Sequence, residues 1–356
     1  MEKSSEKLTD INQIGEFGLI DLITKDFEIV NDSTELSIGD DAAILNYKNQ
    51  KTIVSTDMLV EGVHFDLSYF PLKHLGYKAV VSSISDICSM NGITKQITVS
   101  IAISNRFKLE SIKELYYGIK HACKRYNVDL IGGDTTSSLK GLVISVTAIG
   151  CTTKSGYVTR SGSKPNDLIV VTGSLGGAYL GLQVLEREKQ VFLVNPNNKP
   201  NLSKYKYVVE RQLKPEAKSE VIEFLLENKI TPTSMIDISD GLSSEIIHLS
   251  KNSGNGCIIY EEKLPIAHET VETCKEFKLE ASTIALSGGE DYELLFTIDS
   301  KDLKKIEQNK ELTVIGYITK ESNTNLITRD GKTTPITSMG WKSFWFIKNE
   351  YLFWIH

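Results

Sequence analysis

Aspartates recur in this chain beside glycines or at the ends of short apolar runs. They lie in the segments IGDDAAI (Asp40 and Asp41), VSTDML (Asp57), IGGDTT (Asp134) and IDISDGL (Asp237 and Asp240). A carboxylate at the end of a strand can point into a crevice, whereas a carboxylate on an apolar helix face needs a partner. Asp86 is of the second kind, because SSISDICSM belongs to an otherwise apolar helical segment.

Some of these aspartates also have an ordinary structural explanation. Asp40 and Asp41 suit an Asx turn, and Asp240 before Gly241 suits the N-cap of a helix. Asp237 lies in a short β-type run where aspartate is depleted, which favours a functional role. Together, the strand-end and buried carboxylates indicate a magnesium site, because Mg²⁺ takes oxygen ligands and bridges carboxylates to phosphates.

Two glycine pairs, Gly132-Gly133 and Gly288-Gly289, allow the backbone to approach an anion closely, although either pair also suits a plain tight turn. The chain has no G-x-x-x-x-G-K-[ST] loop, no G-x-G-x-x-G fingerprint and no H-R-D or D-F-G set. These absences exclude P-loop and protein-kinase-like proteins, so a phosphate-handling chain of this kind must use another scaffold.

Hydrophobic periodicity predicts strands and helices mixed along the chain. Helices are predicted at 14–22, 73–91, 108–127 and from Gly173 to about Lys189, and one opens at Asp240-Gly241. Strands are predicted at 51–56 (ending at Asp57), 95–103, 128–131, 141–151, 167–172 and 234–238. Segment 281–298 is predicted as two strands around a Ser287-Gly288-Gly289 turn, and 190–205 as a surface loop. The pattern indicates an α/β or α+β fold, and 356 residues suit about two domains.

The composition narrows the class of protein further. A formal charge of −6 gives no basic excess for binding nucleic acid. The five cysteines form no C-x-x-C pair, so we expect reduced and mostly buried thiols. The apolar runs are of strand length, as at 142–149, and no run approaches the ~20 residues of a membrane span. The charged start MEKSSEKLTD has no signal-peptide pattern, and we expect a cytoplasmic location.

The motifs together carry a family resemblance. The chain contains, in this order, IGDDAA, STDMLVEGVHF, SDICSMNG, IGGDTT, TRSG followed by PND, TGSLGGAYLGL, IDISDGL and LSGGEDYELLFT. In that combination it resembles the thiamine-monophosphate kinases of the aminoimidazole-ribonucleotide-synthetase-like ATP-binding family, over about residues 15–344. It departs at Ser83, where that family usually has Asn, and in RQLKP at 211–215, where Arg-His-Leu-Arg-Pro is usual. Neither departure removes a predicted metal ligand.

The resemblance implies a two-domain α/β (α+β) fold with a mixed sheet and helices in each domain. The N-terminal domain, 14–152, would bind ATP and Mg²⁺ and pair with its copy in a homodimer. The apolar face of the strand at 95–103 is the candidate surface for that pairing. The C-terminal domain, 157–345, would complete the site.

The resemblance also implies roles for individual residues. The implied Mg²⁺ ligands are Asp41, Ser55, Thr56, Asp57, Asp86, Asp134, Asp237 and Asp240. The implied ATP contacts are Gly133, Asp134, Arg160, Ser239 and either Tyr116 or Tyr117. The implied acceptor contacts are Asp57, His64, Glu290 and Trp341, with Glu290 facing the cationic thiazolium and Trp341 stacking on a ring. From the residues alone, packing is the more common role for the tyrosines, a surface salt bridge is the more common role for Arg160, and core packing is the alternative for Trp341.

The implied reaction moves the γ-phosphoryl group of ATP to thiamine monophosphate by direct in-line transfer, the last step in making thiamine diphosphate. Several Mg²⁺ ions would offset the repulsion between the two phosphorylated anions. The acceptor oxygen is already anionic, so no general base is required. Alternatives are a relative that uses ATP on another substrate, such as aminoimidazole ribonucleotide synthetase, selenophosphate synthetase or the hydrogenase-maturation type, and a non-catalytic nucleotide-binding relative.

Overall fold

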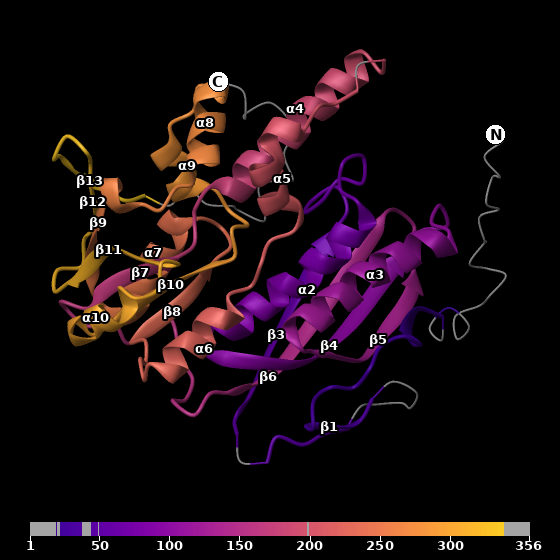
Figure 1. Cartoon of the computed structure of the whole chain (residues 1–356), viewed down its shortest axis with the longest axis horizontal. Helices are drawn as coiled ribbons and strands as arrows, with labels where there is room; N and C mark the ends of the chain where they lie inside the picture. The colour runs from indigo at the N-terminus through magenta and orange to yellow at the C-terminus, as the bar shows by residue number, and fades with distance from the viewer. Residues whose placement is uncertain (1–18, 20–21, 38–43, 49, 198, 338–356) are drawn as a thin grey trace.

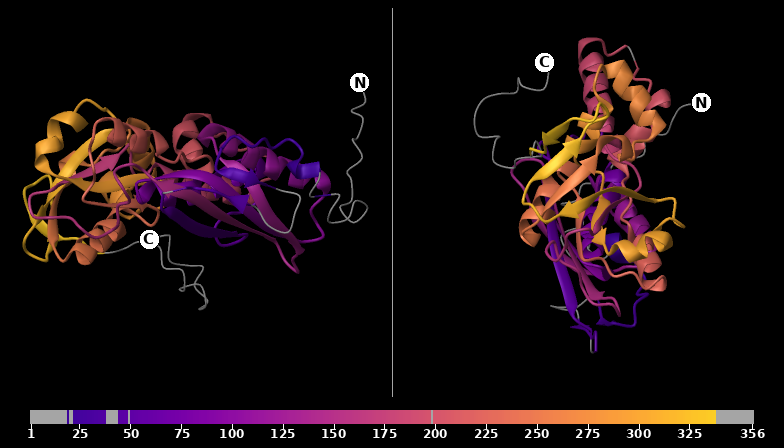
Figure 2. Two further views of the ribbon diagram at one scale, coloured as in Figure 1. Left: turned by 90° about the horizontal axis from the view of Figure 1, so that it is seen from below. Right: turned by 90° about the vertical axis from the view of Figure 1, so that its left-hand side faces the viewer.

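Two large β-sheets, each with helices packed on it, form the described part of this protein. The computed structural model describes residues 19, 22–37, 44–48, 50–197 and 199–337. Within them, a four-stranded sheet has the order β3-β6-β4-β5 and a seven-stranded sheet the order β13-β12-β9-β11-β7-β10-β8. The two sheets lie side by side with helices packed on them (Figures 1 and 2). This arrangement confirms the predicted mixed α/β class.

The first half contains β1 (Thr34–Leu36), β2 (Ile44–Leu45), β3 (Thr52–Val60), α2 (Leu72–Ser89), β4 (Gly92–Ile103), α3 (Leu109–Tyr126), β5 (Asp129–Ser137) and β6 (Leu142–Thr152). The second half opens with β7 (Leu168–Thr172), α4 (Gly177–Val194), η2 (Ser203–Tyr205), α5 (Lys206–Leu213), α6 (Ser219–Glu227), β8 (Ser234–Ile238) and α7 (Leu242–Ser253). It continues with β9 (Gly256–Tyr260), η3 (Glu261–Lys263), α8 (His268–Phe277), α9 (Ala281–Ser287), β10 (Glu293–Ile298), η4 (Ser300–Asp302), α10 (Leu303–Ile306), β11 (Leu312–Thr319), β12 (Thr324–Ile327) and β13 (Thr333–Pro335).

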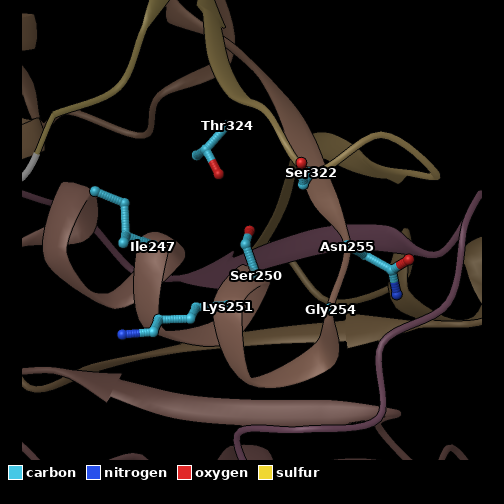
Figure 3. Close-up of a pocket in the computed structure, with 7 residues that line it drawn as sticks. All are labelled: Ile247, Ser250, Lys251, Gly254, Asn255, Ser322 and Thr324. Carbon is cyan, nitrogen blue, oxygen red and sulfur yellow. The ribbon is translucent and has the colours of Figure 1, made fainter.

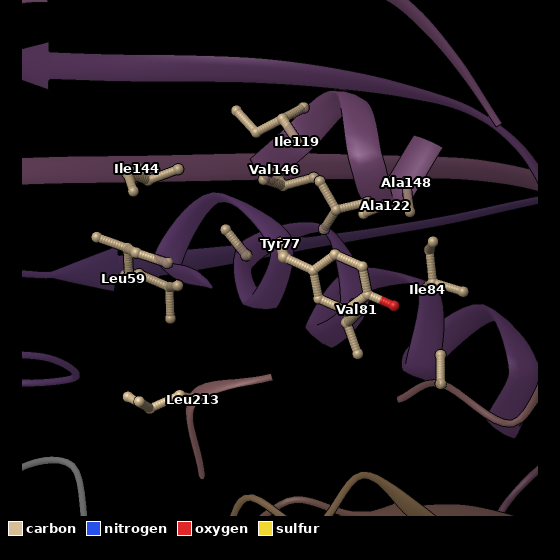
Figure 4. Close-up of a cluster of buried hydrophobic side chains, with 14 of the residues drawn as sticks. Leu59, Tyr77, Val81, Ile84, Ile119, Ala122, Ile144, Val146, Ala148 and Leu213 are labelled. Atoms are coloured by element: carbon tan, nitrogen blue, oxygen red, sulfur yellow. The ribbon is translucent and has the colours of Figure 1, made fainter. Parts of the chain in front are cut away.

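Helices α2 and α3 cover one face of the four-stranded sheet. Figure 4 shows side chains from α2, α3 and β6 in one apolar cluster. The alternation predicted for 95–103 is confirmed, because Ile97, Val99 and Ile101 are at most 2 % exposed beneath these helices. That apolar face is therefore buried within the chain. The prediction that it pairs with a second copy is wrong, because it is already covered by α2 and α3.

The backbones of α2 and α3 come into direct contact at two glycines. A Cβ atom on Gly76 would lie 2.0 Å from the carbonyl oxygen of Leu115, and one on Gly118 would lie 1.8 Å from that of Lys73. Neither clash can be relieved by a rotamer change, because the atoms opposite belong to backbone. The absence of side chains at these two positions therefore sets the distance between the helices.

We predict that Gly118→Ala destabilises the protein, although alanine normally stabilises a helix interior. The methyl group would force α3 away from α2, and overpacking of this kind costs about 1–3 kcal/mol. Urea unfolding followed by circular dichroism measures the change. The exposed Lys113→Ala in the same helix is the control and should stay within about 0.5 kcal/mol of the parent. Equal stability of Gly118→Ala and the parent would contradict the contact.

Four local predictions are wrong. Strand β3 continues three residues past Asp57, so this aspartate lies inside a strand instead of at its end. Strand β5 runs through Gly132-Gly133, which form no turn, and Gly133 is required because a Cβ there would lie 1.9 Å from the Val99 carbonyl oxygen. Helix α4 extends to Val194 into the predicted loop. The segment 281–287 is helix α9, and the predicted helix at 14–22 falls largely outside the described residues.

All five cysteines are buried and unpaired by disulfides, as the sequence predicted. No helix in the described ranges combines the length and the apolar character needed to cross a membrane.

Candidate active site

Helix α2 brings together aspartates from both sheets. The hydroxyl group of Ser83 donates to Asp57 Oδ2 on β3 at 2.8 Å. Two residues later, the hydroxyl group of Ser85 donates to Asp237 Oδ2 on β8, also at 2.8 Å. Because successive helical residues are rotated by about 100°, Ser83 and Ser85 point to different sides of α2. The helix therefore contacts an aspartate of each sheet.

Asp86 joins the same group of carboxylates from α2 itself and accepts a hydrogen bond from Ser55 of β3. Burial, and then the charge of Asp57, raise the pKa of Asp86 to about 6. Burial, and then the charge of Asp86, raise the pKa of Asp237 to about 7. Burial also raises the pKa of Asp57, with a smaller contribution from Asp237. Asp57, Asp86 and Asp237 are three of the predicted ligands, and we call them the acidic cluster. Their negative charges repel one another at a site that is largely buried from solvent.

Asp240 and Arg160 lie at the edge of the acidic cluster. The positive charge of Arg160 opposes the rise in pKa of Asp86, Asp237 and Asp240, so this arginine lies near all three. Asp240 is not the N-cap of α7, since Gly241 occupies that position. The structural explanation of Asp240 as a cap therefore fails, which leaves its carboxylate available for another role.

The sequence interpretation missed Glu245, which lies one turn into α7. This glutamate is 2 % exposed, and its Oε1 accepts the backbone N–H of Asp240 at 3.0 Å. Burial raises its pKa to about 8, and Oε2 has no hydrogen-bond partner among the described residues. An acidic residue next to the apolar pair Ile246-Ile247, in LSSEII, was the signal that could have revealed it.

Asp134 lies apart from the acidic cluster within one chain. It belongs to β5, at the opposite edge of the four-stranded sheet from β3. Pairing across the sheet aligns Asp134 with Ser100, Ser145 and Met58, one residue out of register with Asp57. Because side chains alternate between the two faces of a sheet, Asp134 projects from the open face and Asp57 from the face under α2.

The donor set of the acidic cluster suits a hard divalent cation. Its carboxylates are oxygen ligands, and their mutual repulsion is the kind that bound Mg²⁺ relieves. Each is presently held by a neutral serine hydroxyl, which fixes its orientation without cancelling its charge. In the described part of the chain, no three acidic, histidine or cysteine side chains converge closely enough to hold a metal ion. Asp41, another predicted ligand, lies outside the described residues.

Two predicted acceptor residues form a second polar group beside α2. Glu290 Oε1 lies 2.8 Å from the ammonium group of Lys78, a lysine that is 1 % exposed. The imidazole of His64 accepts the backbone N–H of Val60 on Nδ1 at 3.0 Å, so Nε2 is the nitrogen left to face a ligand. Burial lowers the pKa of His64, while Glu290 opposes and Lys78 reinforces this effect. Trp341 lies outside the described residues.

The remaining predicted contacts occupy varied positions. Tyr116 is 6 % exposed and packs edge-on against Phe27, whereas Tyr117 is 64 % exposed. Ser239 is exposed, and its carbonyl oxygen accepts the backbone N–H of Glu290 at 2.7 Å. Thr56 projects from the open face of the sheet, where its hydroxyl lies 3.0 Å from that of Thr147.

A cavity of about 310 Å³ lies elsewhere, between α7 and the segment leading into β12 (Figure 3). Its lining residues are Ile247, Ser250, Lys251, Gly254, Asn255, Ser322 and Thr324. None of them belongs to the predicted site, and the lining carries no carboxylate. The candidate site is therefore the group of carboxylates around α2, and not this cavity.

Two family models and the fold place the chain in a known class. Residues 39–152 match the family model described as AIR synthase related protein, N-terminal domain, and residues 164–329 match the model for the corresponding C-terminal domain. A hydrogenase maturation protein HypE in complex with ATP has the same fold, with a TM-score of 0.72 at 16 % identity over 93 % of this chain and 98 % of that one. The class is therefore that of two-domain proteins related to AIR synthase.

Within this class, the chain belongs to the thiamine-monophosphate kinase family. It is 35 % identical to the thiamine-monophosphate kinase of Bacillus subtilis, over 90 % of this chain and 96 % of that protein. It is 33 % identical to that of Aquifex aeolicus, over 94 % and 99 % of the two chains. A solved structure described as AaThiL complexed with AMPPCP and TMP superposes with a TM-score of 0.73 at 30 % identity, covering 96 % of this chain and all of that one.

We predict that the metal-free protein loses stability as the pH rises from 5 to 8. A carboxyl group whose pKa is raised by folding stabilises the folded state while it is protonated, and this contribution disappears as the pH passes the raised value. For Asp86 and Asp237 the loss extends from the ordinary aspartate pKa of about 4 up to the raised pKa values of about 6 and 7, so it is largely complete by about pH 7. Between pH 5 and 8 the combined loss is on the order of 2 to 4 kcal/mol. Urea unfolding in a chelator at both pH values measures it.

Asp237→Asn should flatten this pH dependence, because one of the two repelling carboxyl groups is then permanently neutral. The matched control is Asp134→Asn, which removes an exposed carboxylate outside the acidic cluster and should keep the slope of the parent. Identical slopes for the parent and Asp237→Asn would show that the acidic cluster does not destabilise the metal-free fold.

Proposed function

We propose that this protein transfers the γ-phosphoryl group of ATP to thiamine monophosphate, forming thiamine diphosphate and ADP. The observation that carries the proposal is the convergence of Asp57, Asp86 and Asp237 on one buried helix. Carboxylates in this arrangement would repel ATP on their own, so they make sense only together with divalent cations. Membership of the thiamine-monophosphate kinase family supports the choice of acceptor.

Asp57, Asp86 and Asp237 would share Mg²⁺ ions with the phosphates of ATP, because among the described residues no three such side chains converge on a single ion. Asp240 and the oxygens of Ser55 would lie at the margin of this site. Bound Mg²⁺ supplies charge neutralisation for phosphate groups that would otherwise repel each other. The serine hydroxyls keep the carboxylates oriented, so little reorganisation is needed when the cations and ATP bind. The exposed Arg160 lies near the same group, and its guanidinium fork suits a bidentate contact with a phosphate.

Direct in-line transfer needs no general base, because the attacking oxygen of a phosphate monoester is already anionic. The surroundings of His64 agree with this, since its Nδ1 is committed to the backbone N–H of Val60. Its lowered pKa leaves the imidazole neutral at pH 7, suited to hydrogen bonding with the acceptor. Ser239 and Arg160 would then contact ATP, and His64 and Glu290 the acceptor.

The test is ADP release in a coupled assay with thiamine monophosphate or free thiamine as the acceptor. We expect kcat/KM to be at least ~100-fold higher for thiamine monophosphate, because only a phosphate oxygen can share the cations and attack without losing a proton. Omitting the acceptor is the control for ATP hydrolysis. Equal values for the two acceptors would overturn the substrate assignment.

We also propose that the working unit is a homodimer in which two copies build each site. Asp57 and Asp134 lie on opposite edges and opposite faces of one sheet, so a single chain does not bring them together. The open face of that sheet exposes Val54 and Met58, at 61 % and 57 %, on the edge strand β3. Large apolar side chains on an uncovered sheet face favour burial against a partner.

Complementation between inactive variants tests this assembly. Asp57→Asn and Asp134→Asn should each lose nearly all turnover while keeping the fold. After mixing and subunit exchange, half of the dimers are mixed, and each mixed dimer contains one intact site, so about a quarter of the parent activity should return. A mixture that stays as inactive as its components, with exchange verified by mass, would place both aspartates in the site of one chain.

A further inference from the structure

Lys78 is unusual because its charge is removed from water where α2 contacts the C-terminal half of the chain. The side chain extends from α2, is 1 % exposed and lies 5.4 Å from the ring centroid of Phe70. A buried ammonium group is costly unless it is paired and hydrogen-bonded. Its partners here are Glu290 Oε1 at 2.8 Å and the carbonyl oxygen of Gln212 at 3.3 Å, both from the C-terminal half.

Both the side chain and the backbone of Glu290 are held in place, which goes beyond the single contact of an ordinary ion pair. Gln212 Nε2 donates to Glu290 Oε2 at 2.9 Å, so both carboxylate oxygens are held by groups of fixed position. Its backbone adopts φ 65°, a left-handed conformation that residues with a side chain rarely adopt. Strain of this kind persists where the surroundings enforce it, and it collects at ligand-binding sites. Yet the side chain remains 29 % exposed, so part of the carboxylate faces outward.

We propose that Lys78 and Gln212 are positioning residues for the acceptor, holding the Glu290 carboxylate beside His64 as a directed hydrogen-bond acceptor. This inference rests on the proposed function and deepens it. With Lys78 at 2.8 Å, Glu290 contributes little net charge, which argues against simple attraction to a cationic thiazolium ring. Its free lone pairs instead suit an N–H donor, such as the amino group of an aminopyrimidine ring.

The test compares Lys78→Met, Lys78→Arg and Gln212→Met with the parent by steady-state kinetics. Lys78→Met should raise KM for thiamine monophosphate about tenfold or more while KM for ATP changes less than about twofold. The value of kcat should change little, because the lost contact orients the acceptor in the ground and transition states alike. Lys78→Arg should recover part of the loss, since it keeps the charge.

Tyr77→Phe is the matched control for a purely structural role. Tyr77 is the neighbouring residue on α2, and its hydroxyl also bridges to the C-terminal half, donating to Glu216 Oε2 at 2.8 Å. This variant should leave both KM values unchanged. If Lys78→Met behaves like Tyr77→Phe, with lower stability but an unchanged acceptor KM, the positioning role is overturned.

Two further measurements keep the outcome decisive. Gln212→Met removes the hydrogen bond to Glu290 but leaves the ion pair with Lys78 intact, so it tests the proposal even if Lys78→Met folds poorly. This variant should raise KM for the acceptor. An unchanged KM counts against the proposal. Calorimetric titration of thiamine monophosphate into the protein reports binding without turnover, and both variants should weaken it. A parent protein that releases no ADP with thiamine monophosphate would refute the proposed function, whereas an active parent with unaffected variants would refute only the positioning role.

Discussion

The candidate site depends on one buried helix that makes polar contacts with both sheets. Helix α2 packs its apolar residues against the four-stranded sheet, and its serines hydrogen-bond to Asp57 and Asp237 on strands of different sheets. A helix is rigid over this distance, so its two hydroxyls fix how far apart the aspartates lie. Helix α3 packs beside α2 on the same face of the sheet, and the glycine contacts between the two helices hold α2 in place. Packing far from the chemistry thereby determines the spacing of the carboxylates.

A second buried ion network explains why the SGGED segment has structural and functional residues side by side. Asp291 accepts the backbone N–H groups of Gly176 and Ala178 at 2.6 and 3.1 Å, at the start of helix α4. Arg211 lies 2.9 Å from Glu293 and also donates to the carbonyl oxygen of Asp291 at 3.0 Å. Such buried pairs add little net stability, but they specify one conformation. Asp291 and, two residues beyond it, Glu293 are both fully buried and committed to the fold, whereas Glu290 keeps an exposed edge.

Sequence patterns predicted the long elements well, because helix α2 and strands β4 and β6 have strong hydrophobic periodicity. They also singled out Asp57 at an expected strand end, Asp86 on an apolar helix face and Asp237 in a short strand, and α2 contacts or contains all three. They failed where tertiary contact decides the local structure. At Gly133, the carbonyl oxygen of Val99 on the neighbouring strand β4 excludes a side chain. They could not show that Asp134 lies on the far edge of the sheet, because strand order is set by long-range pairing. Lys78 gave no signal, since a lysine on an amphipathic helix normally reaches solvent.

The polar partners along α2 explain how one helix can support two kinds of recognition. Lys78 and Ser85 are seven residues apart, two turns of helix, so both point toward the C-terminal half. Ser85 holds Asp237 with a neutral hydroxyl, which leaves the negative charge available to a cation. Lys78 holds Glu290 with an ammonium group, which cancels the charge and leaves only directional lone pairs. The choice between a neutral and a charged donor at equivalent helix positions therefore separates a region suited to Mg²⁺ and phosphate from a region suited to an organic ring.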